Sequence, residues 1–525
     1  MTRCRILCLC PQPDRFLALQ QATGEPGDPQ LELVPERAPT AAAAVQRLSE
    51  AYVALLLLDL RCEEGVQEAL KLLDSLDDLD DVEARYGFHR IVALVQGDTD
   101  AVDQLIGDLG RRGLRHILRQ RGDDDAFHER VMARITSTLI SRATPQTALC
   151  ASGGGITGIF FELGALKCLD DCTDGAVNGF DSYYGISAGA VVTSLLAVGY
   201  SVDEILAGVA GRSGGPIPPL DLALLKMGHL NTPDIARRLR AALGGSLHGA
   251  VQALRQHDMP DTDALFLEAT AMIGAPFHSE GFEAMLRPLM EAVGSTNSFE
   301  RLPRPLFVGA SDQDRRAHVL FGDEGHRDVP ISRAVQASLS INPAFSAVQI
   351  GDRWFEDGAV TRTSDFGHAV KKGATLVVVL DPFLPWVSDE PGAVNRRGML
   401  YNVDQTLRSM SWTRFEQARD WTLRRHPEVS SYTFVPGNRA RQLLSRNPMD
   451  HRPFLQIFQA AYLSTLRRIQ RLRPRLAGDL AHHGMHLDTQ RADAVADRLR
   501  ATEAPQLEDF FPGGVVRLRP GPRMP

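Results

Sequence analysis

The pentapeptide Gly185-Ile186-Ser187-Ala188-Gly189 decides the fold of the central part of the chain. Residues 180–184 precede it and are typical of a strand, and residues 190–198 follow it as an apolar run that predicts a buried helix. A G-x-S-x-G sequence in this context predicts a nucleophile elbow, a sharp turn that holds the serine hydroxyl at the open end of a sheet. Gly185 and Gly189 lack a Cβ, so that neighbouring segments can approach the strained turn closely.

A glycine-rich stretch, Gly153-Gly154-Gly155-Ile156-Thr157-Gly158, lies upstream between a predicted strand at 148–152 and a predicted helix at 159–166. Its spacing is not that of a dinucleotide-binding motif, and the lysine of a P-loop is missing. Such a loop can also direct several backbone N–H groups at one point, where they stabilise a developing alkoxide. We therefore expect an oxyanion hole within 153–158. Its members are Gly153, Gly154, Gly155, Ile156 and Gly158, with the amides of 154, 155 and 156 as the main donors.

The third informative stretch is 351–360, which contains Asp357-Gly358-Ala359. A nucleophilic serine needs a group that accepts its proton. Asp357 can accept it directly if the turn at Gly358 brings the carboxylate within hydrogen-bond reach of Ser187, because geometry matters first and pKa second. We therefore expect a Ser187–Asp357 catalytic dyad.

Together these stretches resemble the patatin-like phospholipase family, which carries a glycine-rich oxyanion loop, G-x-S-x-G and a D-G-[GA] aspartate. The resemblance covers roughly 147–381 and includes 305–312, where the family has a strand ending in an acidic loop, and 334–345, which leads into the aspartate motif. It implies an α/β fold, a three-layer sandwich with a mostly parallel sheet. Thr157 stands where the family often has Arg or Lys, so charge assistance from that position is in doubt.

The resemblance also implies an activity. The expected protein is a serine acyl hydrolase that cleaves lipid carboxylic esters, like phospholipase A or a lysophospholipase, through an acyl-enzyme and without a metal or organic cofactor. Hydrolysis of intracellular polyesters or small esters would use the same dyad and stays open. So does a regulatory or binding protein built on an inactive hydrolase scaffold, although a scaffold has no need for all three motifs.

Two other arrangements compete with this dyad. His368 follows Asp357 and would complete the Ser, Asp, His order of α/β-hydrolases, but it falls in a segment predicted to be a helix leading away from the site. We favour a structural or surface role for His368, as for His229 and His278. The second D-G-A, at 174–176, would lie at the opposite end of the strand from the serine, and we expect a plain turn there.

The first segment, 1–143, predicts a small doubly wound α/β domain, because short apolar runs alternate with helix-like pieces. In outline it resembles a receiver domain of the two-component type, with Asp59 at the end of the third strand, where the phosphoacceptor stands. The acidic pair, the Ser or Thr and the lysine of a receiver site are missing at 11–14, 96–98 and 119–122. We expect a degenerate domain, not phosphorylated at Asp59, that serves docking or dimerisation.

The remaining boundaries follow from composition and periodicity. The hydrolase segment spans 144–385 with a helical insertion at about 202–298, which shapes the acyl pocket, acts as a lid or only adds packing. The segment 386–525 is expected to be mainly helical, with helices at 399–425 and 453–472 and a disordered tail after Asp509. For the arginine-rich second helix we favour packing on the core over lying on a membrane surface.

Charge and cysteine content narrow the partners. A net charge of −8 gives no support for nucleic-acid binding, and the seven cysteines lack zinc-type spacing, so that reduced buried thiols and no metal are expected. The apolar runs are too short for a signal peptide or a bilayer span. We expect a cytoplasmic protein with a lipid ester substrate, peripheral contact with the inner membrane surface as an open alternative, and a homo-oligomeric or other protein contact through the N-terminal domain.

Overall fold

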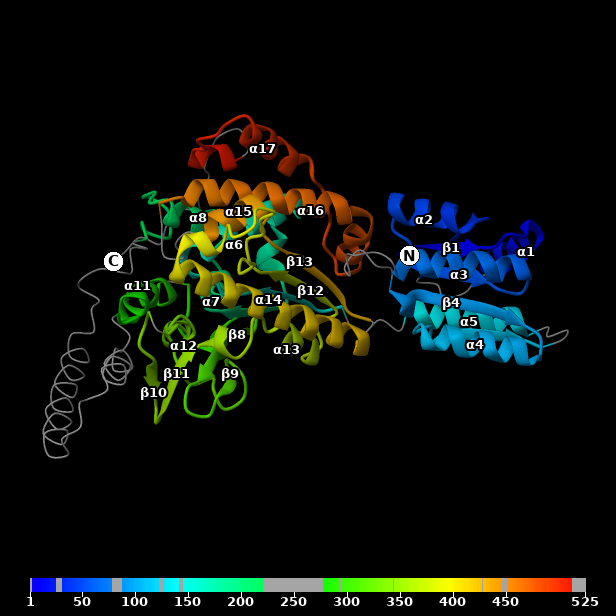
Figure 1. Ribbon diagram of the computed structural model, residues 1–525, viewed down its shortest axis with the longest axis horizontal. Coiled ribbons are helices and arrows are strands. Elements are labelled where there is room, and N and C mark those ends of the chain that lie inside the picture. The colour runs from blue at the N-terminus through cyan, green and yellow to red at the C-terminus, as the bar shows by residue number, and fades with distance from the viewer. Residues whose placement is uncertain are drawn as a thin grey trace, which may run out of the picture.

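The computed structural model describes residues 2–24, 31–77, 87–121, 126–140, 145–220, 277–292, 294–342, 344–426, 428–445 and 452–511. Much of the predicted helical insertion, residues 221–276 with His229, lies outside the described residues, as does the tail beyond residue 511. Figure 1 shows a smaller N-terminal unit beside a larger unit that contains the rest of the described chain.

The N-terminal unit is a doubly wound α/β fold, as predicted. Its five strands are all parallel and run in the order β2-β1-β3-β4-β5, the flavodoxin-like order. Helices α2, α3 and α4 bury apolar residues against one face, and α1 and α5 cover the other. The elements are β1 (Thr2–Leu9), α1 (Pro13–Gly24), β2 (Leu31–Ala38), α2 (Ala41–Glu50), β3 (Leu55–Asp59), α3 (Glu63–Asp77), β4 (Ile91–Gln96), α4 (Asp100–Arg111), β5 (His116–Gln120) and α5 (Phe127–Ile140).

The larger unit is built on a mixed sheet in the order β10-β11-β8-β7-β6-β12-β13, with β9 paired to β8. The five strands from β8 to β13 in this order are parallel, whereas β9, β10 and β11 pair antiparallel at one side. The strands are β6 (Thr147–Ala151), β7 (Ser182–Ile186), β8 (Leu306–Asp312), β9 (Ala317–Phe321), β10 (Val348–Ile350), β11 (Arg353–Asp357), β12 (Leu376–Leu380) and β13 (Ser430–Phe434).

Helices cover both faces of this sheet, which confirms the predicted three-layer sandwich with a mostly parallel sheet. Strand residues alternate between the layers: Leu149 belongs to the core under α6, α7 and α16, while Ala148 and Cys150 belong to the core under α13 and α14. The helices are α6 (Gly155–Cys172), α7 (Ala188–Ala197), α8 (Val202–Val209), α11 (Glu280–Met290), α12 (Ile331–Ser338), α13 (Phe366–Lys371), α14 (Met399–Arg425), α15 (Asn438–Leu444), α16 (Phe454–His482) and α17 (Gln490–Arg500).

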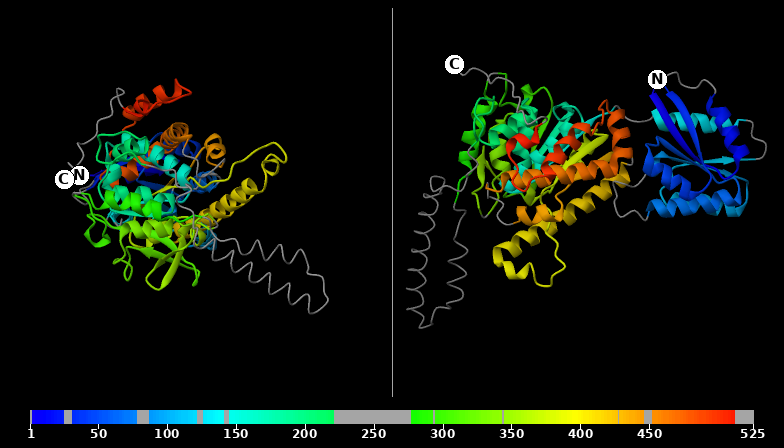
Figure 2. Two further views of the ribbon diagram at one scale, coloured as in Figure 1. Left: turned by 90° about the vertical axis from the view of Figure 1, so that its left-hand side faces the viewer. Right: turned by 90° about the horizontal axis from the view of Figure 1, so that it is seen from above.

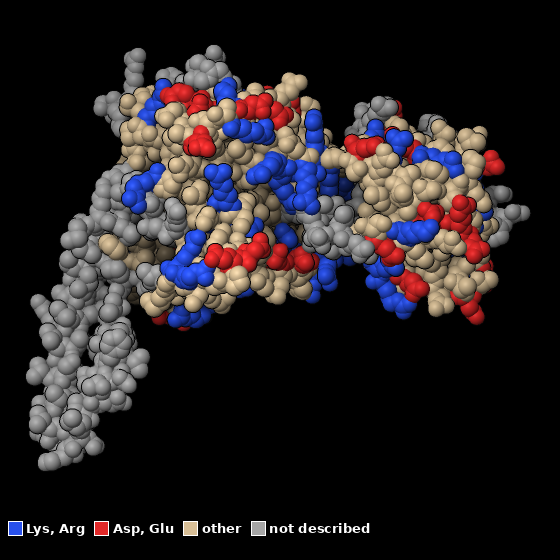
Figure 3. Space-filling model, turned by 45° about the horizontal axis from the view of Figure 1, so that its top comes forward, with Lys and Arg blue, Asp and Glu red and all other residues tan. Residues whose placement is uncertain are grey.

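Helix α16 packs on the core, as favoured from its sequence, but it is longer than predicted. Its apolar stripe, including Phe458 and Tyr462, is buried against α6, where Gly164 leaves room for the close approach. Instead of ending at residue 472 it continues through Pro474 and reaches the N-terminal unit. Figure 3 shows basic side chains gathered on this face of the larger unit, next to the smaller one.

A buried ion pair joins the two units at the end of α16. Arg90 Nη2 lies 2.7 Å from Asp479 Oδ1, and the Tyr432 hydroxyl donates to Asp479 Oδ2 at 2.7 Å. Burial alone would raise the pKa of Asp479, but the charges of Arg90 and Arg475 hold this pKa well below its usual value. Because a lone buried charge is costly, this pair ties the orientation of the units to the C-terminal part of α16.

Candidate active site

Ser187 stands at the sharp turn between β7 and α7, as the motif predicts. Its backbone has φ 54° and ψ −121°, a strained conformation for a residue with a side chain. A Cβ on Gly185 would lie 2.5 Å from Ala190 Cα, and a Cβ on Gly189 would lie 2.2 Å from the Ala151 carbonyl oxygen. Only glycine fits at either position, so that α7 can fold back against the sheet directly after the serine.

The strained turn is held by a hydroxyl from a distant helix. The Ser187 amide donates to Ser338 Oγ at 2.8 Å, and that hydroxyl donates to the Gly309 carbonyl oxygen at 2.7 Å. Ser338 ends α12 and is completely buried. Sequence reasoning gave Ser338 no role, because its only signal was membership of the family-like stretch at 334–338.

Asp357 lies at the end of β11, which pairs with β8, and β8 also pairs with β7, the strand that leads into Ser187. The Asp357 carboxylate interacts with the Ser187 side chain. Oδ1 of Asp357 also accepts the Ala359 amide at 2.8 Å, and both dyad residues are buried. Burial raises the pKa of Asp357 to about 7; the hydrogen bonds from Ser187 and Ala359 oppose this rise, and the charge of Glu356 adds to it. The structure thus brings together the two residues predicted to form the dyad.

The main chain around Asp357 is also anchored. Its amide donates to the Ser340 carbonyl at 3.1 Å, and its carbonyl accepts the Ser311 hydroxyl at 2.9 Å. A Cβ on Gly358 would lie 2.3 Å from the Gly309 carbonyl oxygen, so the turn after the aspartate requires glycine. These contacts hold the carboxylate in a fixed position beside the serine.

The glycine-rich stretch lies directly against Ser187. A Cβ on Gly153 would be 3.1 Å from Ser187 Cβ and 3.6 Å from its Oγ, so Gly153 leaves space beside the hydroxyl. The Gly189 amide donates to the Ser152 carbonyl at 3.0 Å and ties the elbow to this stretch. The predicted loop and the predicted nucleophile are therefore neighbours.

The predicted loop is shorter than expected, because α6 begins at Gly155 rather than at residue 159. The first amides of a helix have no intrahelical acceptor, which leaves those of Gly155 and Ile156 available, with Gly154 as the helix cap. The Gly158 amide instead donates to the Gly154 carbonyl at 3.1 Å. The Gly158 amide is therefore engaged within the helix, and the place of Gly158 in the oxyanion hole stays a prediction.

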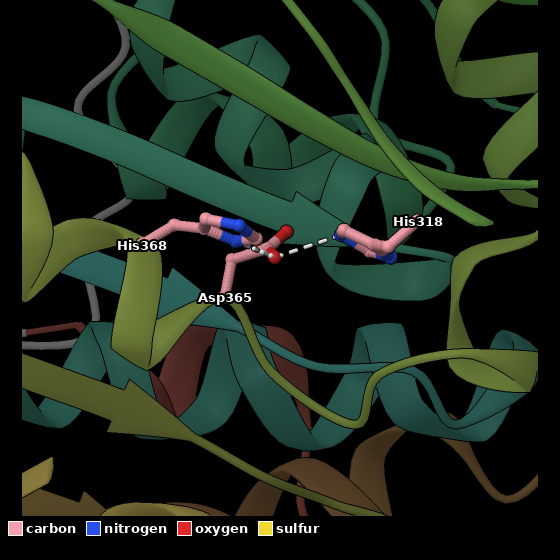
Figure 4. A group of neighbouring side chains, drawn as sticks. All are labelled: His318, Asp365 and His368. Atoms are coloured by element: carbon pink, nitrogen blue, oxygen red, sulfur yellow. Dashed lines mark hydrogen bonds and ion pairs between the residues drawn. The ribbon is translucent and has the colours of Figure 1, made fainter.

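The two alternatives to the dyad, a triad with His368 and the second D-G-A at 174–176, lie elsewhere in the structure. His368 Nδ1 is hydrogen-bonded to Asp365 Oδ1 at 2.9 Å, and His318 contacts the same oxygen, as Figure 4 shows. His278 follows the bridge residue Phe277 in the segment leading into α11. The second D-G-A is the expected turn, with positive φ at its first two residues, and it lies at the other end of β7 from the serine.

The carboxylate of Asp59 in the N-terminal unit has cationic partners. Arg61 Nε lies 2.7 Å from Oδ1 and Arg61 Nη2 lies 2.9 Å from Oδ2, so the pair is bidentate. Arg15 Nη1 is 3.9 Å from Oδ1, and the Cys10 thiol donates to Oδ2 at 3.4 Å. Arg61 was not singled out from the sequence, although its position two residues after Asp59 is the signal that could have indicated it.

Comparison with known proteins agrees with the fold and the motifs. Residues 149–370 match the model of the Patatin-like phospholipase family, and no curated protein matches the chain. A similar solved structure is VipD from Legionella pneumophila, at 14% identity and TM-score 0.32 over 68% of this chain and 75% of VipD.

A second similar solved structure is full-length ExoU from the type III secretion system of Pseudomonas aeruginosa, in complex with SpcU. It is 15% identical, with a TM-score of 0.24 over 69% of this chain. The match spans 61% of that ExoU chain, less than two thirds of its length. Residues 149–370 of this chain are a patatin-like phospholipase domain.

Proposed function

We propose that this protein is a serine acyl hydrolase that cleaves lipid carboxylic esters through Ser187 and Asp357, as a phospholipase A or lysophospholipase does. The observation that carries the proposal is that the glycine-rich stretch, Ser187 and the turn after Asp357 meet at one buried site: a Cβ on Gly153 would lie 3.1 Å from Ser187 Cβ and 3.8 Å from Ala359 Cβ. The match of residues 149–370 to a phospholipase family supports a lipid ester as the substrate class.

Each step of the proposed reaction has a residue to perform it. Ser187 Oγ attacks the ester carbonyl carbon while its proton moves to Asp357, whose raised pKa makes the carboxylate a better base than an exposed one. The amides of Gly154, Gly155 and Ile156 stabilise the negative charge on the carbonyl oxygen. Collapse of the tetrahedral intermediate releases the alcohol, which takes the proton from Asp357, and water then cleaves the acyl-enzyme by the reverse sequence.

Contact with a lipid surface is proposed through one face of α14. Its large apolar residues at spacings of three and four are Met399, Val403, Leu407 and Met410, each at least 50% exposed. Figure 2 (right) shows α14, in yellow, projecting from the body of the larger unit. Exposed apolar side chains on a projecting helix are costly in water and are typical of a membrane contact.

The exposed face of α14 lies beside the proposed dyad. Arg414 of α14 donates to the carbonyls of Ala359 and Val360 at 3.1 and 3.2 Å, directly after Asp357 in the chain. Val360 itself is 38% exposed. A lipid surface that covers this face would therefore meet the chain next to the catalytic aspartate. No helix in the described part of the chain combines the length and apolar character needed to cross a bilayer.

The N-terminal unit is proposed to be a docking or dimerisation unit that is not phosphorylated. Its strand order is that of the flavodoxin-like folds, to which receiver domains belong, but Arg61 occupies both oxygens of Asp59. Incubation with acetyl phosphate and intact-mass measurement tests this point. A phosphorylated species that disappears in Asp59→Asn would contradict it.

The hydrolase proposal is tested with a fluorophosphonate probe on the full chain. We expect labelling of wild type and none of Ser187→Ala; labelling that persists in Ser187→Ala would remove the assignment. A substrate panel of phospholipids, lysophospholipids, triglycerides and p-nitrophenyl esters then separates the proposed lipid hydrolase from a small-ester enzyme. A chain that neither takes the probe nor cleaves any ester would be a scaffold.

The lipid contact has its own test. The double variant Leu407→Asp, Met410→Asp is expected to lose roughly tenfold or more of its activity on phospholipid vesicles and to keep its activity on a short soluble ester. Leu17→Asp, at a residue of α1 that is 53% exposed, is the matched control. Equal losses on both substrates would mean that the α14 change damages the enzyme rather than its contact with lipid.

A further inference from the structure

Three side chains that the proposed reaction does not use converge in the larger unit: His318 of β9, Asp365 and His368 of α13 (Figure 4). His318 Nε2 and His368 Nδ1 each lie 2.9 Å from Asp365 Oδ1, and the two imidazole rings stack with centroids 5.6 Å apart. The three ligand atoms all lie within 4.8 Å of one another. The residues come from two segments, so the cluster exists only in the folded chain.

The carboxylate at the centre of this cluster is fully buried and has no Lys or Arg partner among the described residues. Asp365 is 0% exposed at the side chain, and its Oδ2 has no hydrogen-bond partner in the described part of the chain. A Cβ on Gly309 would lie 2.6 Å from this oxygen, so glycine at 309 makes room for it. Buried carboxylates in proteins are paired with a cation or coordinate a metal ion.

We propose that His318, Asp365 and His368 form a binding site for a divalent transition-metal ion of the zinc type. Two imidazole nitrogens and one carboxylate oxygen are donors that zinc takes in proteins, with a water molecule in the fourth position. Bonds of about 2.0–2.1 Å in a tetrahedral site put ligand atoms roughly 3.3 Å apart. The two 2.9 Å contacts with Asp365 Oδ1 are therefore within a few tenths of an ångström of a coordinating geometry.

The surroundings suit this role. His318 Nδ1 is hydrogen-bonded to Thr361 Oγ1 at 2.8 Å, which orients the ring so that Nε2 faces the carboxylate. The His318 side chain is 7% exposed, whereas the His368 side chain is 23% exposed, so an ion and its water molecule can enter from the His368 side.

A bound ion would brace the segment that carries Asp357. Thr361 Oγ1 lies 2.8 Å from Ser311 Oγ, which donates to the Asp357 carbonyl at 2.9 Å. This path runs from His318 through two hydroxyls to the main chain of the proposed base. The three ligands would therefore act as positioning residues, which hold the loop from 357 to 365 in place.

The test is metal binding by the full chain after treatment with a chelator. Titration with Zn²⁺ against a chromophoric competitor is expected to fill one site with a Kd of roughly 1 μM or tighter. Replacement by Co²⁺ should give the visible absorption of a low-coordinate site. His318→Ala and Asp365→Asn are expected to weaken this binding by about 100-fold or more, because each removes a ligand.

Two controls make the result decisive. His426→Ala removes a partly exposed histidine that contacts Glu428 outside the cluster, and it should bind zinc like wild type. Ser187→Ala should also bind zinc normally, so that failure of the metal site and failure of the proposed hydrolase activity are read separately. If folded wild type holds no more zinc than His318→Ala, the cluster is a hydrogen-bonded His–Asp–His group and the proposal is overturned.

Discussion

Asp357 and Asp59 are two aspartates at the ends of strands, and each is 2% exposed. Asp59 is held by the bidentate guanidinium of Arg61, whereas Asp357 contacts a hydroxyl and a main-chain amide. A cation favours the ionised carboxylate, while burial among neutral groups favours the protonated form. The comparison teaches that burial alone does not make a carboxylate a proton acceptor, because the charge of its partners decides.

The largest expected difference between the two aspartates is in activity. Asp357→Asn is expected to lower kcat/KM for an ester substrate by about 1000-fold or more, because the amide cannot accept the proton of Ser187. Asp59→Asn should stay within about twofold of wild type, since Asp59 lies in the other unit. An Asp357→Asn enzyme that retains a tenth of wild-type activity would mean that another group is the base.

The next effect concerns Arg61. Arg61→Ala leaves Asp59 buried without its main cation, and we expect a loss of about 2–3 kcal/mol in the free energy of unfolding of the N-terminal unit, with Arg15 limiting the loss. Arg61→Lys should recover part of it. Urea unfolding followed by hydrogen exchange measures the change in that unit. An unchanged stability would mean that the Arg61 pair is no more than a surface contact.

Asp357→Asn is expected to stabilise the protein while it removes activity. The pKa of Asp357 is raised from 3.8 to about 7, so between these values the folded chain holds a proton that the unfolded chain has released. The free energy of unfolding therefore falls as the pH rises from about 4 to 7. An amide does not ionise, so Asp357→Asn avoids this loss of stability, which is worth roughly 2–4 kcal/mol at pH 8. Thermal unfolding at pH 8 and pH 4.5 measures it.

The gain from Asp357→Asn should shrink toward pH 4.5, where the wild-type carboxyl is protonated in the folded state and partly protonated in the unfolded state. Asp59→Asn should show no such gain, since its amide would leave Arg61 buried without a counter-charge. Equal gains for both substitutions at pH 8 would contradict the comparison.

The last predicted effect is the pH dependence of the wild-type enzyme, which is smallest within one pH unit of the midpoint. Because Asp357 must be ionised to accept a proton, kcat/KM should fall about tenfold for each pH unit below about 7 and level off above it. A folding control at each pH separates this loss from unfolding. A midpoint near pH 4 would indicate that the carboxylate is better solvated than its burial suggests.

Much of the fold and the site could be predicted from short stretches. The elbow at Ser187 and its two glycines follow from local sterics, which a pentapeptide and its flanks carry by themselves. The parallel N-terminal sheet follows from alternating apolar runs. The earlier start of the helix has a local cause: a glycine-rich segment was not expected to start a helix, yet α6 begins at Gly155 rather than at residue 159.

Other parts could not be predicted, because their partners are far apart in the chain. Ser338 binds the Ser187 amide across a separation of 151 residues, and Arg90 pairs with Asp479 across 389. No periodicity links such positions. The extension of α16 past Pro474 has the same origin, since the turns beyond it are held by contacts with the rest of the fold rather than by their own helix propensity.

The sequence by itself determined the candidate nucleophile, the strand–turn–helix that presents it and the class of fold, because these depend on backbone sterics and on apolar periodicity within a few residues. The tertiary structure decided which partner each of three buried carboxylates has: Asp357 lies beside a serine, Asp59 under an arginine and Asp365 between two histidines. The physical reason is that desolvation and Coulomb interactions depend on distance in space, and only the folded chain defines those distances.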